Sequence, residues 1–287
     1  MYVISGASGN TGKVVATQLL KAGKKVRALV RSADKAKDLA ALGAEVVTLD
    51  LSDSAALKGA LAGASGFYLL SPPSMSSQSF LAERTQLMQS VAATVKAAAV
   101  PHVVFLSSVG GHQPDGTGII QTVAAGERAL RGTGIPFSVV RAGYFAENWA
   151  AVLPVAKQDG VLPSFIPADL KVPTVCTADI GALGAEALLD GPRGERILEL
   201  AGPVDPTPKE VAATVGKILG KPVQLVEPPL DAVVPTFTSF GISSDVASLY
   251  RGMYVGIING RVSFEGGKAE SRRGSTSLET TLRQLLQ

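Results

Sequence analysis

Three glycines at positions 6, 9 and 12 stand between an apolar run and a helical pattern, within Ser5–Gly12. A tight turn of this kind needs positive φ, which glycine tolerates at little cost. Without side chains the backbone can approach a pyrophosphate, and the helix N-terminus that follows offers it free N–H groups. We therefore predict a dinucleotide-binding turn, with an empty glycine-rich turn as the alternative. Its contact residues would be Gly6, Ser8, Gly9, Asn10, Thr11 and Gly12.

The end of the next apolar run indicates which dinucleotide binds. Arg31 stands about 20 positions after the glycine turn, where an acidic residue would accept from the ribose of NAD. A guanidinium suits a 2′-phosphate instead, and Lys35 adds a second cation. We therefore expect NADP(H), with NAD(H) as the weaker possibility and a solvated strand end as the alternative for Arg31. The strand ends expected along the adenine and central ribose are Asp50, Leu51, Leu70, Ser71 and Pro72.

A catalytic pair common in related chemistry is missing. Many short-chain dehydrogenases protonate the substrate with a tyrosine assisted by a lysine one helical turn later, commonly followed by a glutamate. Glu127 fits the glutamate, but Val123 and Ile119 occupy the other two places, and no tyrosine lies between Tyr68 and Tyr144. We therefore expect no alcohol–ketone chemistry that uses a phenol acid.

The remaining candidates suit hydride transfer to an acceptor that needs little acid catalysis. A quinone or cationic dye is its own electron sink, so the protein contributes orientation and exclusion of water. We expect Ser107 and Ser108 beside the nicotinamide and name His112 as the catalytic candidate; a solvent-exposed loop histidine is its alternative interpretation.

A flat acceptor also needs a wall to lie against. Several residues after two of the strand patterns suit this role, although core packing explains them equally well. The candidates are Met75, Tyr144, Phe145, Asn148 and Trp149.

Strand and helix patterns alternate over the first half of the chain, which positions these residues. We expect strands at 2–5, 25–31, 45–49, 67–70, 102–107 and 136–141. We expect helices at 14–20, 33–42, 54–61 with Asp53 as its N-cap, 79–99 and 119–131. Nearly all-apolar strands in such alternation are typical of a parallel sheet covered on both faces. The sequence therefore predicts an α/β fold: a Rossmann-type doubly wound sheet.

After Tyr144 the alternation breaks, and four prolines punctuate a stretch that we expect to be rich in loops. Helices are expected at 179–189, 206–219, 230–240, 244–258 and from 277, and short strands at 196–200 and 223–226. We interpret Arg272 and Arg273 as a solvated turn. The domains would be 1–150, which binds NAD(P), and 151–287, a smaller α+β substrate lobe, with 179–201 returning to the first.

Composition excludes several classes of protein. Of 287 residues, 46% are hydrophobic and 18% charged, which excludes a disordered chain. The net charge of +3 comes without a basic patch, so we expect no nucleic-acid partner. The sequence has a single cysteine, which predicts a cytoplasmic protein. It has no cluster of metal ligands and no apolar run long enough to span a membrane, so we expect neither a bound metal nor membrane contact. The expected partner is a small-molecule acceptor; a homodimer stays open.

Several stretches resemble the NmrA-like family of atypical short-chain dehydrogenases/reductases. They are GASGNTG at 6–12, LVRSADKAKDL at 29–39, LGAEVVTLDLSD at 42–53, HVVFLSSVGGHQPDGTG at 102–118, IPFSVVRAGYFAENW at 135–149 and LYRGMYVGIINGRVSFEGG at 249–267. The resemblance implies a Rossmann core, NAD(P)H binding and a 2′-phosphate on Arg31. One branch reduces quinones, azo dyes or triphenylmethane dyes. Another consists of redox sensors that bind NADP without turnover, act through a protein partner, and provide the alternative function.

Overall fold

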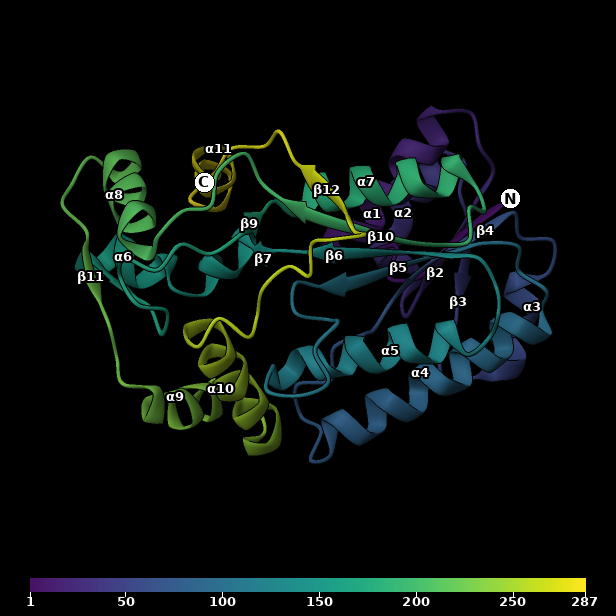
Figure 1. Cartoon of the computed structure of the whole chain (residues 1–287). Helices are drawn as coiled ribbons and strands as arrows, with labels where there is room; N and C mark the ends of the chain where they lie inside the picture. Colours follow the sequence, from purple (N-terminus) through teal and green to yellow (C-terminus); the bar gives the residue numbers. More distant parts are fainter.

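An eight-stranded parallel sheet forms the centre of the protein (Figure 1), whose computed structural model describes residues 1–287. Its strands, in spatial order, are β12 (Glu270–Arg273), β10 (Glu195–Ala201), β6 (Phe137–Ala142), β5 (Val103–Ser108), β4 (Gly66–Leu70), β1 (Tyr2–Ile4), β2 (Val26–Val30) and β3 (Glu45–Thr48). The direction of winding reverses between β1 and β4, which confirms the predicted Rossmann-type doubly wound sheet. Ligands of such sheets bind at this switch point, beyond the carboxyl ends of the strands.

Helices cover both faces of the sheet (Figure 1). One face carries α1 (Asn10–Lys21), η1 (Ala33–Ala36), α2 (Lys37–Ala41) and α7 (Thr177–Asp190), and the other carries α3 (Ser54–Leu61), α4 (Phe80–Ala97), η2 (Gly118–Ile120) and α5 (Gln121–Arg131). Successive strand side chains point to opposite faces, so Ile4 and Tyr68 pack in one core cluster while Val3 and Phe67 pack in the other. This double burial explains the almost uninterrupted apolar strands.

Local signals account for several helix boundaries. The Asp53 side chain accepts hydrogen bonds from the backbone N–H groups of Ala55 and Ala56, at 3.1 and 2.9 Å, which confirms it as the N-cap of α3. The predicted helix over Ser244–Ile258 is α10, and Ser243 caps it. No helix of the protein combines the length and apolar character that crossing a bilayer requires.

The rest of the chain packs beside the carboxyl ends of the strands, on the left of Figure 1. Its elements are β7 (Tyr144–Phe145), η3 (Ala146–Ala151), α6 (Leu153–Asp159), β8 (Val161–Pro163), β9 (Thr174–Val175), α8 (Pro208–Leu219), β11 (Gln224–Val226), η4 (Leu230–Ala232), α9 (Val233–Ser239), α10 and α11 (Leu278–Leu285). Two small apolar clusters hold them together, one around Trp149 and the other around Tyr254. The domain boundary near residue 150 stays a prediction.

Two segments differ from the expectation. The stretch after Tyr144 contains α6, which tolerates Pro154 because the proline lies in the first turn. Arg272 and Arg273 do not form a solvated turn but belong to β12, which pairs with β10 at the edge of the sheet. Each arginine reaches a carboxylate far away in the sequence, Arg272 that of Glu186 and Arg273 that of Asp205.

Candidate functional site

A cleft of about 970 Å³ lies at the carboxyl ends of β1 to β5, where the winding reverses. Most residues predicted to hold a cofactor lie in its wall. They are Gly6, Ser8, Gly9, Asn10, Thr11, Arg31, Asp50, Leu51, Leu70, Ser71, Pro72, Ser107 and Ser108. Gly12 and Lys35 do not line it: Gly12 is buried behind the turn and Lys35 is exposed on η1. The roles of these side chains stay predictions.

The glycine turn has the backbone that its sequence requires. Gly6 has a φ of +58°, and the Gly9 N–H donates to the Gly6 carbonyl at 2.9 Å. A Cβ on Gly12 would lie 2.8 Å from the carbonyl carbon of Gly6, so only glycine lets α1 pack this closely on the turn. No side chain caps α1 and its first turn has no acidic residue, which leaves the positive helix end open to an anion.

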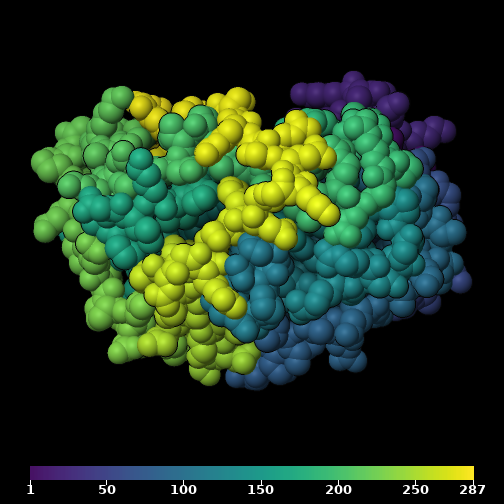
Figure 2. Space-filling model, viewed as in Figure 1, coloured from purple at the N-terminus to yellow at the C-terminus, as the bar shows by residue number.

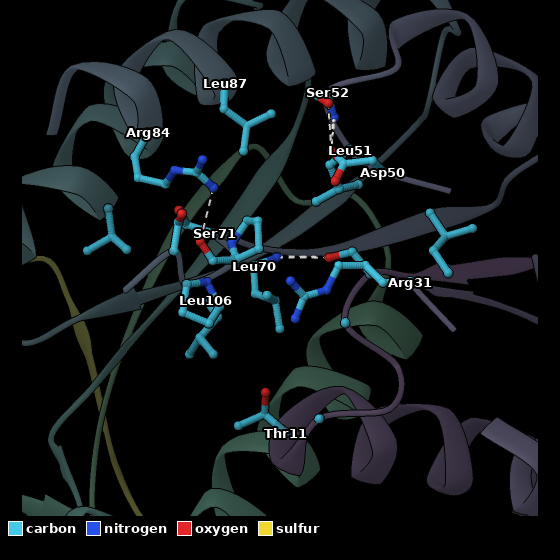
Figure 3. A pocket seen from close by; sticks show the side chains of 18 of the residues that line it. Thr11, Arg31, Asp50, Leu51, Ser52, Leu70, Ser71, Arg84, Leu87 and Leu106 are labelled. Atoms are coloured by element: carbon cyan, nitrogen blue, oxygen red, sulfur yellow. Dashed lines mark hydrogen bonds between the residues drawn. The ribbon is translucent and has the colours of Figure 1, made fainter. Parts of the chain in front are cut away.

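A positive and a negative side chain line the cleft just beyond two strand ends, Arg31 after β2 and Asp50 after β3. Figure 3 shows Arg31 beside Asp50, with Thr11 on the α1 side and Arg84 on the α4 side. Asp50 accepts from the Ser52 hydroxyl at 2.6 Å and from the Ser52 N–H at 2.8 Å. These bonds hold the pKa of Asp50 below its usual value, and the positive charges of Arg31 and Arg84 add to the effect. Asp50 is therefore an ionised acceptor in the cleft wall.

Five of the other lining residues have neither an acidic nor a basic side chain: Ser107, Ser108, Val123, Phe145 and Thr177. Val123 stands four residues before Glu127, where the catalytic pair would have its lysine. The cleft wall therefore has an isopropyl group in place of that lysine. The Ser107 hydroxyl donates to the Glu127 carboxylate at 2.6 Å.

His112 lies outside the cleft wall. It is half-buried in the loop after β5, and its Nε2 lies 3.0 Å from the amide nitrogen of Gln113. Its Nδ1 is buried without a hydrogen-bond partner. Its catalytic role stays a prediction that the cleft geometry does not support.

Of the residues predicted as a wall for the acceptor, only Phe145 lines the cleft. Tyr144 and Trp149 instead pack edge to face, with ring centroids 6.3 Å apart. Asn148 is exposed, and Met75 is 37% exposed while its carbonyl accepts from Ser243 N–H at 2.8 Å. The apolar contacts of Tyr144 and Trp149 favour the packing interpretation.

No tyrosine in this region is prepared to act as an acid. Burial raises the pKa of Tyr144 to about 12. Burial also raises the pKa of Tyr68, whose hydroxyl is buried without a hydrogen-bond partner. Both phenols are therefore weaker acids than a free tyrosine.

One face of α4 completes the cleft and was not predicted from the sequence. Its lining residues are Glu83, Arg84, Gln86, Leu87 and Ser90. The Arg84 guanidinium lies 5.6 Å from the centroid of the Phe80 ring and donates to the Pro72 carbonyl at 3.2 Å. The recurrence of these five α4 residues at helical spacing was the signal in the sequence that could have revealed them. That signal does not reveal which face of α4 meets the cleft.

Proteins of similar sequence include a quinone oxidoreductase and an azoreductase. The chain is 29% identical to quinone oxidoreductase 2 of Escherichia coli over 276 residues, 95% of this chain and 93% of that protein. It is 24% identical to NAD(P)H azoreductase of Xenophilus azovorans, over 88% of this chain and 86% of that one.

Solved structures agree with this likeness over the whole chain. The NADPH complex of the NADPH-dependent quinone oxidoreductase from Escherichia coli has a TM-score of 0.84 at 27% identity, with 100% of both chains covered. The NADP(H) complex of triphenylmethane reductase from Citrobacter sp. has a TM-score of 0.82 at 22% identity, again over 100% of both chains, and shows the fold alone. The NmrA-like family model matches residues 2–253, and the chain therefore belongs to the NmrA-like family.

Proposed function

We propose that the protein is an NADPH-dependent reductase that transfers hydride to a flat, electron-poor acceptor of the quinone, azo-dye or triphenylmethane-dye type. The observation that carries the proposal is the cleft itself. It combines an open glycine turn and Arg31 with a wall that includes no tyrosine, histidine or lysine. The likeness to a quinone oxidoreductase and an azoreductase supports the same activity.

The cleft residues fit NADPH from end to end. The uncapped N-terminus of α1 and the Gly6 turn suit the pyrophosphate, because backbone N–H groups and the helix dipole both favour an anion. Arg31 suits the 2′-phosphate through paired N–H donors. Asp50, as an ionised acceptor, suits donor groups of the adenosine. A 2′-phosphate on Arg31 would favour NADPH over NADH.

The expected chemistry follows from the absence of tyrosine, histidine and lysine in the cleft wall. When bound, the cofactor supplies hydride. A quinone or azo acceptor also takes up one proton from water, whereas a cationic triphenylmethane dye is neutralised by the hydride alone. Val123 and Phe145 offer an apolar surface on which a conjugated ring can lie, and they exclude water from it. Ser107, Ser108 and Thr177 offer hydroxyls that can orient a ligand but do not titrate near neutral pH. Acceptors that need no strong acid are therefore favoured over simple ketones.

Turnover with purified protein tests the proposal. Loss of NADPH absorbance should be fast with a quinone or an azo dye and slow with an aliphatic ketone of similar size. Tight NADPH binding without turnover of any acceptor would overturn the proposal and favour the redox-sensor alternative. No structural observation supports that alternative.

The small-molecule acceptor is the only partner that this function requires. A homodimer and a cytoplasmic location stay predictions. Sedimentation of the purified protein and localisation of a tagged chain would test them.

A further inference from the structure

Ser107 holds its proton on the side away from the cleft. Its hydroxyl donates a hydrogen bond to Oε1 of Glu127 at 2.6 Å. Both side chains are buried, with Ser107 3% and Glu127 2% exposed. Because Ser107 also lines the cleft, its oxygen offers the cleft lone pairs and no hydrogen.

Glu127 is paired with a buried arginine. Arg141 donates from Nε to Oε1 at 3.1 Å and from Nη2 to Oε2 at 2.7 Å, and the arginine is 2% exposed. A buried guanidinium requires such a counter-charge, and two-point pairing fixes the plane of the carboxylate. The orientation of the Ser107 hydroxyl therefore depends on Arg141 through Glu127.

Further contacts fix the positions of Glu127 and Arg141. Arg141 Nη1 also donates to Glu265 at 2.5 Å. The chain at Glu265 is held in turn because the backbone N–H groups of Glu265 and Gly266 donate to Glu199, at 2.6 and 3.1 Å. A Cβ on Gly111 would lie 2.6 Å from Glu127 Oε1, so the loop after β5 closes over the carboxylate. Figure 2 shows the C-terminal part of the chain crossing the face between the two parts of the molecule.

We propose that Ser107 is the hydrogen-bond acceptor for a hydroxyl of the nicotinamide ribose, and that Glu127 and Arg141 are positioning residues that make it an acceptor. The inference rests on the proposed function. A lysine that could hold this ribose is absent, since Val123 occupies the corresponding part of the wall. An oriented serine beside Val123 supplies the missing polar contact, and a ribose hydroxyl is the donor that the nicotinamide half of NADPH brings to the strand ends.

Binding of two ligands separates this contact from the rest of the cleft. Adenosine 2′,5′-bisphosphate carries the 2′-phosphate but no nicotinamide ribose. Ser107→Ala should weaken NADPH about five- to tenfold, the loss expected for one hydrogen bond, and leave the bisphosphate unchanged. Ser107→Thr, which keeps the hydroxyl, should restore binding. Ser248→Ala removes an exposed serine hydroxyl on α10 and serves as the matched control.

Glu127→Gln tests the positioning role. An amide can turn its NH₂ toward Ser107, which would then present its proton to the cleft. We expect a selective loss of NADPH affinity, and at saturating NADPH a lower kcat with little change in the KM of a quinone.

The 3-acetylpyridine analogue of NADPH, which keeps the ribose, should show the same dependence on Ser107. Loss of that dependence would assign the contact to the carboxamide and overturn the inference.

The outcomes also separate this inference from the proposed function. If the unmodified protein reduces a quinone but Ser107→Ala binds NADPH as tightly as before, only the inference fails. Equal losses for NADPH and the bisphosphate would indicate a disturbed fold and would likewise overturn it. If the unmodified protein binds NADPH without turnover, the proposed function fails while the affinity differences still test the contact.

Discussion

Arg141 and Glu127 form a two-point ion pair in the interior, and each side chain is only 2% exposed. Removing one partner leaves an unpaired charge out of reach of water. We expect Arg141→Ala to lower the free energy of unfolding by about 3–5 kcal/mol. Arg283→Ala removes an exposed pair with Glu279 one helical turn away and should cost no more than about 0.5 kcal/mol.

Urea unfolding of both variants measures the difference. A loss for Arg141→Ala no larger than that for Arg283→Ala would show that the interior tolerates the charge, and that the pair does not hold this region together.

Arg31 should determine the preference between the two nicotinamide dinucleotides. Arg31→Ala removes charge-assisted hydrogen bonds to the 2′-phosphate, so the Kd of NADPH should rise about 10- to 100-fold while that of NADH changes little. Lys35→Ala is the matched control, because Lys35 lies outside the cleft wall and should have a smaller effect. Calorimetry gives both constants; equal losses for the two cofactors would refute the assigned contact.

Gly12 should tolerate no side chain. In Gly12→Ala the methyl group would lie 2.8 Å from the Gly6 carbonyl carbon and 3.0 Å from the Ser5 carbonyl oxygen. We expect destabilisation of about 1–3 kcal/mol and a marked loss of NADPH binding, because α1 must move away from the turn. Gly59→Ala in α3 meets nothing within 4 Å and should stabilise the protein by about 0.5–1 kcal/mol. Thermal unfolding that ranks these two variants in the opposite order would contradict the packing argument.

His102 should make the fold sensitive to acid. The ring is fully buried, with Nε2 3.1 Å from the Ser138 hydroxyl. Burial, with a smaller effect from Arg196, lowers the pKa of His102 to about 4. The unfolded chain binds this proton near pH 6.5, so stability falls as the pH decreases from about 6.5 to 4, by up to about 3 kcal/mol. Chemical unfolding at several pH values measures the slope, and His102→Gln should reduce it. An unchanged slope in that variant would assign the acid sensitivity to other groups.

Features that depend on local backbone were predictable from the sequence. The glycine turn follows from Gly6, and the N-cap Asp53 precedes the helix that it caps. Most of the parallel strands are largely apolar, so their existence and order along the chain were also evident. Arg31 could be placed at the cleft because any strand end of such a sheet points to the same edge.

Features that depend on distant partners were not predictable. β12 contains Arg272 and Arg273 with no alternation of apolar residues, and its pairing with β10 relies on backbone bonds and remote carboxylates. Arg84 was missed because its place in the cleft depends on how α4 rotates over the sheet. Tyr144 and Trp149 were expected in the cleft, yet aromatic side chains serve packing and stacking equally well, and only tertiary contacts distinguish the two.

The edge strand β12 also bears on how the protein is made. It pairs with β10 across almost seventy intervening positions, and Glu265, just before it, pairs with Arg141. During synthesis the first half of the chain leaves the ribosome long before these residues exist. Until they emerge, the β10 backbone edge stays bare and Arg141 lacks one of its carboxylates, so the last step of folding must follow translation of residue 273.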